Sequence, residues 1–211
     1  KILVGGQGAF YGQGTAPYGE HRNQLCRLNA DGSWDASFET AGGAGNAGFV
    51  ESVNQILVQP DQRIVISGNI ARWGRVTRKS IARLHPDGAL DLSFDSGEGP
   101  GGLGGIQSLG LLPNGQIYVV GTFSTFDGIQ SPAITRLNQD GSVDEGYRGP
   151  NIIHVRDIAV LPDGTAFIAG GFRSGPFTPP ISASHVTEVD WKHPSTGSTH
   201  KLASYEFEPM C

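Results

Sequence analysis

Short apolar runs that end in glycine recur along the chain, and each has the length and composition of a buried β-strand. They occupy residues 2–6, 64–68, 117–121 and 166–170. No segment shows helical spacing over a useful length. A repeat of about 50 residues made of short strands lies in the range of propeller blades. We therefore predict an all-β fold of the β-propeller type.

The other parts of the repeat are equally regular. An Asp-Gly turn follows four residues after Arg27, Arg83 and Arg136, which predicts a strand before the turn and an edge strand after it. The predicted edge strands end at Phe38, Phe94 and Tyr147. A further strand precedes each apolar run, because residues 53–59, 107–112 and 155–161 carry apolar side chains two and four places before a proline. Each blade is thus predicted to have four strands, joined by tight turns in which Asn/Asp-Gly accepts a positive φ.

The repeats predict one domain over residues 1–211, built of four blades. Blade 1 comprises residues 1–50 and 199–209, blade 2 residues 51–102, blade 3 residues 103–150 and blade 4 residues 151–198. Tyr205 and Phe207 stand four and two places before Pro209, which matches the first strand of a blade. We expect this C-terminal strand to pair in blade 1 and close the ring, which removes open sheet edges. The alternative is a fragment of a larger propeller.

Composition narrows the class of partner. The net charge of −5 argues against nucleic acid, and no apolar run approaches the roughly 20 residues that span a bilayer. The chain does not begin with Met, which we interpret as a processed or excised piece. Cys26 and Cys211 form either one disulfide or two thiols, and strand register places Cys211 nearer Leu28 than Cys26. The oligomeric state is not predicted.

The pattern of an apolar strand, Pro-Asp-Gly, Ile-x-Val-x-Gly, a loop and Arg-Leu-Asn-x-Asp-Gly-Ser-x-Asp-x-Ser-Phe resembles the delta-60 repeat family of bacterial β-propeller-like repeats. The resemblance covers most of residues 1–170. It implies the propeller fold and a place in a secreted or surface-attached bacterial protein. The resemblance therefore implies an extracellular or cell-surface location. It implies no particular chemistry, because the family has no established reaction.

Three motifs are compatible with a metal or cofactor site, and each has a simpler interpretation. The repeated aspartates fit Asx turns better than a Ca²⁺ site, which needs six to eight converging oxygens. Residues 43–48 match Gly-x-Gly-x-x-Gly, but a strand follows instead of a helix, so they are interpreted as a flexible linker. His185, His193 and His200 lack the spacing of a helical zinc site. We therefore predict no cofactor, no metal and no catalytic residue.

Long connections at 7–23, 69–80, 122–133 and 171–186 differ between blades and emerge on one face of the predicted propeller, where binding usually resides. Their aromatic, arginine and acidic side chains suit a sugar ring or a protein surface. The alternative is that the aromatic rings cap the hydrophobic layers of the blades. The candidate ligand-binding residues are Tyr11, Tyr18, His21, Arg22, Trp73, Arg75, Arg78, Phe123, Phe126, Asp127, Phe172 and His185, with Phe177 in the same loops.

Two functions remain open on this basis. The first is a non-catalytic module that binds a glycan or a protein on the loop-rich face, without nucleic acid or membrane insertion. The second is a polysaccharide-acting hydrolase or lyase that uses His185, Asp127 or His21 on the same face. We favour the binding module, because the sequence contains no paired carboxylate motif of the kind that holds a catalytic acid and a catalytic base close together.

Overall fold

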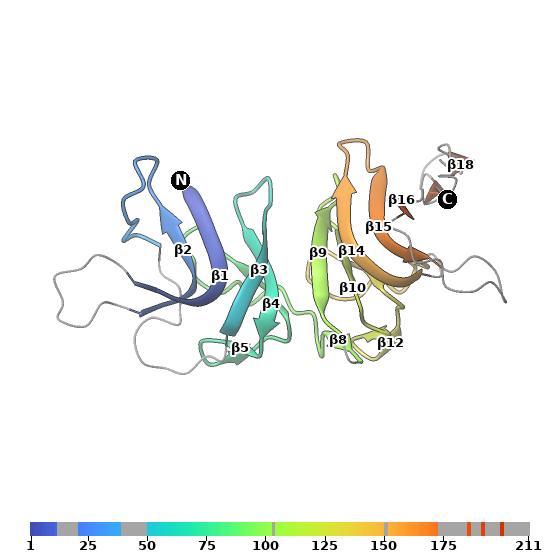
Figure 1. Ribbon diagram of the computed structural model, residues 1–211, viewed down its shortest axis with the longest axis horizontal. Helices are drawn as coiled ribbons and strands as arrows, with labels where there is room; N and C mark the ends of the chain where they lie inside the picture. The colour runs from blue at the N-terminus through green and yellow to red at the C-terminus, as the bar shows by residue number, and fades with distance from the viewer. Residues whose placement is uncertain are drawn as a thin grey trace, which may run out of the picture.

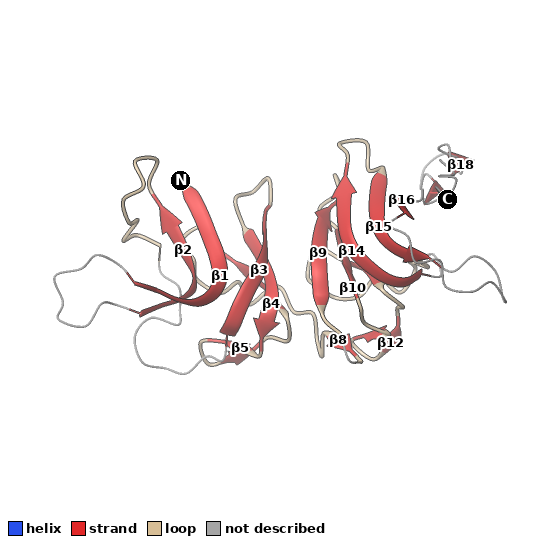
Figure 2. Ribbon diagram, viewed as in Figure 1, coloured by secondary structure: helices blue, strands red, loops and turns tan. Residues whose placement is uncertain are grey.

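The computed structural model describes residues 1–11, 21–38, 50–102, 104–149, 152–172, 185–186, 191–192 and 199–200. Within these ranges the regular structure is entirely β (Figure 2). No helix among these residues has the length and apolarity that a membrane crossing requires. The sheets stand one behind another along the molecule (Figure 1), which agrees with the predicted repeat.

Each predicted blade contains antiparallel strands in chain order. Blade 1 is built of β1 (Ile2–Tyr11) and β2 (His21–Leu28), and blade 2 of β3 (Val50–Val58), β4 (Ile64–Ile70) and β7 (Ile81–Leu84). Blade 3 is built of β9 (Ile106–Leu111), β10 (Ile117–Gly121) and β13 (Ile134–Leu137), and blade 4 of β14 (Ile152–Val160), β15 (Ala166–Phe172) and β16 (His185–Val186). The central strand of each is β1, β4, β10 or β15. A single pair, Gln7 with Ser52, joins β1 to β3.

The predicted edge strands are a correction to the sequence-based expectation. Each is a single bridge residue, Trp34, Leu90 or Val143, after which the chain turns. The edge strand ends after one residue because an aspartate follows each bridge. In blade 2, Asp91 accepts the backbone N–H of Ser93 through its side chain and that of Phe94 through its carbonyl. These bonds hold the backbone in a turn and leave it unavailable to a neighbouring strand.

Among the described residues, the turns at 29–33, 59–63, 85–89, 112–116, 138–142 and 161–165 share one hydrogen-bond pattern. In the turn between β9 and β10, Leu112 donates to the carbonyl of Gln116, and Gly115 donates back to Leu112. Gly115 has φ +84°, and Gln62 takes the same place in blade 2 with φ +68°. The side chain of Asn114 accepts the N–H of Gln116. The predicted Asx-type roles of Asp31, Asp87 and Asp140 are confirmed, because each accepts the N–H two residues further on.

The core consists of three apolar layers between consecutive blades. Ile64 and Ile66 of β4 face the layer shared with blade 1, whereas Val65 faces the layer shared with blade 3. The same alternation divides β10, whose Val119 packs toward blade 2 and whose Val120 packs toward blade 4. β4 and β10 therefore pack on both faces, which confirms the prediction of buried strands at residues 64–68 and 117–121.

Ring closure is not seen among the described residues. The partners of β1 are β2 and β3. Thr199 and His200 form β18 (Thr199–His200), which pairs with β17 (Trp191–Lys192) and lies at the end of the molecule remote from β1 (Figure 1). Residues 202–209 and Cys211 lie outside the described ranges, so the closing strand remains a prediction and the choice between one disulfide and two thiols remains open. Cys26 is buried in β2, opposite Val4.

The position of the glycine that ends each central strand is expected to be sensitive to substitution. A Cβ at Gly121 would lie 2.1 Å from the carbonyl oxygen of Gly105, at an irregularity in the pairing of β10 with β9. Gly121→Ala is expected to lower the free energy of unfolding by about 1–3 kcal/mol through overpacking. Gly105→Ala is the control, because a Cβ there meets nothing within 4 Å. Urea denaturation measures both, and equal effects of the two variants would contradict the steric explanation.

Candidate functional site

Two of the long loops adopt the same hairpin, which corrects the expectation that they differ in every blade. In blade 2, β5 (Arg72–Trp73) pairs with β6 (Val76–Thr77), and in blade 3, β11 (Thr125–Phe126) pairs with β12 (Ile129–Gln130). β8 (Pro100–Gly101) adds to the second hairpin. The backbone bonds also correspond, since Ser80 donates to Ile70 in one loop and Ala133 to Phe123 in the other.

The aromatic candidates of these hairpins are core residues. Trp73 and Phe123 are 3% exposed and Phe126 is fully buried. Phe123 and Phe126 meet edge to face with ring centroids 5.6 Å apart. Their burial favours the alternative that these rings cap the hydrophobic layers. Arg78 is also buried, and its guanidinium contacts the carbonyl of Thr77 and the carboxylate of Asp95.

The hairpin tips carry the candidates that remain accessible. Arg75 and Asp127 are exposed at corresponding turns. Asp127 has φ +48° and accepts the backbone N–H of Glu98 at 2.8 Å. In blade 1 the backbone sets Tyr11 opposite His21. Tyr18 and Phe177 lie outside the described residues, and the side chains of Tyr11, His21, Arg22, Phe172 and His185 are likewise not described.

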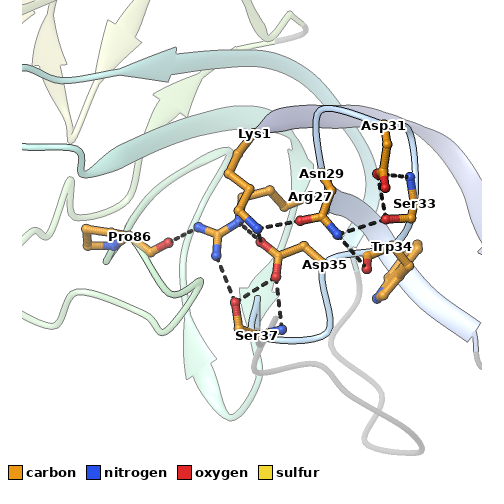
Figure 3. A network of polar contacts seen from close by, with 9 residues as sticks. All are labelled: Lys1, Arg27, Asn29, Asp31, Ser33, Trp34, Asp35, Ser37 and Pro86. Carbon is orange, nitrogen blue, oxygen red and sulfur yellow. Dashed lines mark hydrogen bonds and ion pairs between the residues drawn. The ribbon is translucent and has the colours of Figure 1, made fainter.

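A cluster of charged and hydroxyl side chains lies at the opposite end of the blades, beside the tight turns. In blade 1 the Arg27 Nε donates to the Asp35 Oδ2 at 2.7 Å, and Ser37 donates to the other carboxylate oxygen at 2.7 Å (Figure 3). The guanidinium also covers the Phe38 ring, 4.7 Å from its centroid. Lys1 adds a second cation 3.0 Å from Asp35. The cluster therefore joins the start of β1, β2 and the turn that replaces the predicted edge strand.

The same cluster recurs in the next two blades. Arg83 and Asp91 are 2.7 Å apart and almost fully buried, and Arg136 and Asp144 form the third pair. The residue before each central strand also reaches the aspartate, as Arg63 does for Asp91 at 3.3 Å. The guanidinium of Arg83 lies 4.8 Å from the Phe94 ring centroid.

These contacts hold the carboxylates ionised. Burial opposes ionisation of Asp91, but hydrogen bonds from Ser93 and Arg83 outweigh it and lower the carboxyl pKa to about 2. The pKa of Asp35 is lowered further, first by the Ser37 hydroxyl and then by Lys1. For Asp144, Arg136 outweighs the effect of burial and lowers the pKa. In the described part of the chain, no three His, Cys, Asp or Glu side chains converge as metal ligands.

The arginines also tie consecutive blades together. Arg27 donates to the carbonyl of Pro86 in the turn of blade 2, and Arg83 donates to the corresponding carbonyl, that of Gln139 in blade 3, at 2.5 Å. One arginine side chain thus neutralises an aspartate of its own blade and donates a hydrogen bond to a backbone carbonyl in a turn of the next blade. The sequence motif predicted the turn aspartates but missed this role of the arginines.

A cleft of about 470 Å³ opens beside this link, between the turns of blades 2 and 3. Its walls come from both tight turns of blade 3, from the first turn of blade 2, and from the Arg83 cluster. The lining residues are Gln59, Pro60, Asp61, Arg63, Arg83, Ser93, Pro113, Asn114, Gly115, Gln139 and Asp140. None of them was among the predicted site residues.

Gln59 is unusual within the lining. It is 6% exposed, and its Oε1 has no hydrogen-bond partner among the described residues. An unsatisfied buried oxygen costs about 1–3 kcal/mol. The corresponding residues of blades 3 and 4 are Leu112 and Leu161, so comparison of the repeats provides a signal that sequence reasoning did not use.

This arrangement defines the chain as a β-propeller repeat protein. Residues 1–38, 59–94 and 112–147 match the family described as "Domain of unknown function (DUF5122) beta-propeller", and the chain belongs to that family. The match supports a propeller-like repeat family without bearing on the delta-60 name. No curated protein sequence matches the chain.

Two solved structures are similar in fold. One is XC5397, a gluconolactonase from Xanthomonas campestris, with 20% identity, a TM-score of 0.45, and coverage of 72% of this chain and 52% of that protein. The other is the WD40 β-propeller domain of Doa1, with 15% identity, a TM-score of 0.43, and coverage of 71% and 40%. The chain thus spans about half the length of the gluconolactonase and less of the Doa1 domain.

The buried pair in blade 2 predicts a large effect of removing one charge. Asp91→Asn is expected to lower the free energy of unfolding by about 3–5 kcal/mol, because the buried Arg83 guanidinium loses its counterion. Asp61→Asn is the matched control, because Asp61 is half exposed and its pair with Arg63 is worth about 0–1 kcal/mol. Chemical denaturation at neutral pH measures both, and a loss below about 1 kcal/mol for Asp91→Asn would contradict the prediction.

The lowered pKa values predict acid sensitivity. Because the folded carboxyl of Asp91 titrates at about 2, below its unfolded value near 3.9, its ionisation stabilises the fold above pH 4. This contribution is lost as the pH falls from about 4 toward 2. Thermal midpoints measured across this range are expected to fall more steeply for the wild-type chain than for Asp91→Asn. Parallel curves for the two would show that Asp91 is not the titrating group.

Proposed function

We propose that the chain is a non-catalytic binding module of a secreted or surface-attached protein, and that its ligand is a glycan or a protein. The observation that supports this proposal is that the recurring charged side chains form ion pairs within the fold. Arg27, Arg83 and Arg136 each neutralise an aspartate of their own blade. The motif that recurs most faithfully along the chain therefore builds a frame.

The state of the carboxyl groups supports binding over catalysis. General acid catalysis uses a group whose pKa is raised toward neutrality. Among the described carboxyls with a shifted pKa, every shift is downward: Asp31, Asp35, Asp91, Asp140 and Asp144. Such groups accept hydrogen bonds and hold positions, which suits a rigid scaffold.

The loop-rich face is the proposed binding surface. Two of its hairpins are anchored by buried rings, so their tips are held on a rigid base and present Arg75 and Asp127 to solvent. Loops carried by a rigid frame are common binding sites. The frame itself is proposed to have four blades, with residues 202–209 supplying the first strand of blade 1.

Binding and turnover distinguish the proposal from an enzyme. The purified chain is screened on a glycan array, and the same glycans are incubated with it while reducing ends and unsaturated products are measured. We expect at least one glycan to be retained without turnover. Its affinity is expected to fall about tenfold or more in the double variant Arg75→Ala/Asp127→Asn, because both exposed tip charges are removed.

The control removes the same charges elsewhere. Glu145 and Arg148 are exposed near the turn that ends blade 3. Arg148→Ala/Glu145→Gln is expected to keep wild-type affinity. Turnover of a glycan would overturn the non-catalytic proposal, whereas equal losses in the two double variants would overturn the assignment to the hairpin tips.

A further inference from the structure

An extra residue interrupts the first strand of blades 2, 3 and 4 at the same place. In blade 2, Val53 and Gln55 of β3 pair with consecutive residues of β4, so Asn54 between them has no partner in the ladder. The same register shift leaves Gln107 of β9 and Arg156 of β14 unpaired in their ladders. Each is a β-bulge, a feature that redirects a side chain and is frequent at sheet edges and next to active sites.

The glycine at the end of the central strand allows the bulged strand to approach closely. A Cβ at Gly68 would lie 2.1 Å from the carbonyl oxygen of Ser52, two residues before Asn54. The distance from a Cβ at Gly121 to the carbonyl oxygen of Gly105, the corresponding residue of blade 3, is also 2.1 Å. A glycine inside a strand often marks such a close approach of two backbones. In blades 2 and 3 the bulge therefore depends on the glycine that ends the apolar run.

The bulges lie on neighbouring strands, on the side of the loop-rich face. Each is opposite the glycine that precedes a long loop, and the tight turn follows at the other end of the strand. β9 contacts both β3 and β14, and Figure 1 shows β9 and β14 side by side. The Ser108 hydroxyl of β9 donates to the Asp157 Oδ1 of β14 at 2.7 Å. Gln107 and Arg156, which precede these two residues, are therefore neighbours on adjoining strands.

The fold makes no use of the bulged side chains. Asn54, Gln107 and Arg156 are all exposed, and their side chains form no hydrogen bond or ion pair with another described residue. The acidic neighbour Asp157 differs, because its carboxylate accepts two hydrogen bonds within the fold and forms no ion pair with Arg156. Two amides and one unpaired guanidinium are thus free to contact a ligand.

The chemistry of these groups favours a saccharide that carries a carboxylate. β9 and β14 each end their sheet, and a bulge twists such an edge away from the regular ladder that an added peptide strand needs. Recognition by side chains is then the alternative. The amides of Asn54 and Gln107 both donate and accept, as sugar hydroxyls do. The planar guanidinium of Arg156 matches a carboxylate, to which it can donate two parallel hydrogen bonds.

We propose that the three bulged residues form a binding site for an acidic saccharide. A carboxylate of the saccharide pairs with Arg156, and its hydroxyls bond to the amides of Asn54 and Gln107. The proposal rests on the proposed function, because the site lies on the same loop-rich face and names the class of ligand. It adds side chains of the first strands to the hairpin tips as ligand contacts.

Matched acidic and neutral ligands test the ion pair. Trigalacturonate, trimannuronate and the methyl ester of each are titrated into the wild-type chain by calorimetry. We expect at least one acid to bind, and its ester to bind about tenfold or more weakly, because the ester has no charge to pair with Arg156. Arg156→Gln introduces the residue that blade 3 carries, and is expected to remove this preference for the acid. Its thermal midpoint should stay within about 2 °C of wild type, because the position is exposed.

Further variants separate the hydroxyl contacts from the charge. Asn54→Ala and Gln107→Ala are each expected to weaken binding of the acid about threefold to tenfold, while the preference for acid over ester stays. Arg148→Gln removes an exposed arginine at the end of blade 3 and should leave the affinity unchanged.

Three results would overturn the proposal: no binding of either acid, equal affinities of the wild-type chain for acid and ester, or an unchanged preference in Arg156→Gln. Binding of a triglutamate peptide that depends on Arg156, with no saccharide bound, would overturn it in favour of an acidic peptide.

The same titrations distinguish this proposal from the proposed function. Cleavage of an acidic saccharide whose binding depends on Arg156 would overturn the non-catalytic function and leave the site at the bulges standing. Affinity that is lost in Arg75→Ala/Asp127→Asn but kept in Arg156→Gln would support the hairpin tips and overturn the site at the bulges.

Discussion

The described structure depends on central strands that are apolar on both faces. Ile64 and Ile66 of β4 pack toward blade 1 and Val65 packs toward blade 3, so blade 2 is covered only when it has a neighbour on each side. Stability is therefore shared between blades, as in other repeat proteins. The described ends show the converse, since Ile2 is 50% exposed and Phe167 is 40% exposed. Closure of the ring, or the alternative of further blades, would cover both faces.

Polar contacts fix the spacing that the apolar layers leave undetermined. Hydrophobic packing is non-directional, whereas the buried Arg83 can satisfy Asp91, Ser93 and the carbonyl of Gln139 in only a narrow range of positions. The last of these acceptors belongs to the next blade. Replacement of the whole cluster by apolar residues could preserve burial, but it would remove the link that sets one blade against the next. We interpret the recurrence of the arginine–aspartate pair in blades 1, 2 and 3 in this way.

Patterns of local origin were predictable from the sequence, and contacts between blades were not. The central strands and the tight turns follow from alternation and from Asp-Gly pairs, which act within a few residues. The edge strands were wrongly predicted, because the alternation around Leu90 takes no account of how Asp91 captures the N–H of Ser93. Aromatic residues such as Trp73 and Phe126 looked like ligand contacts because sequence alone does not show burial. The cleft was missed since its walls come from two different blades.

Departures from a repeat carry information that the repeat itself does not. The first turn of blade 2 departs at Gln59, where the other blades have leucine, and at Gln62, where glycine is found in blades 3 and 4. Both choices oppose stability, the first through an unpaired oxygen and the second through a left-handed backbone at φ +68° in a residue with a Cβ. Structural requirements alone would favour the residues of the sister blades. These two residues are unfavourable for the fold, and both lie in the turn that forms one wall of the cleft.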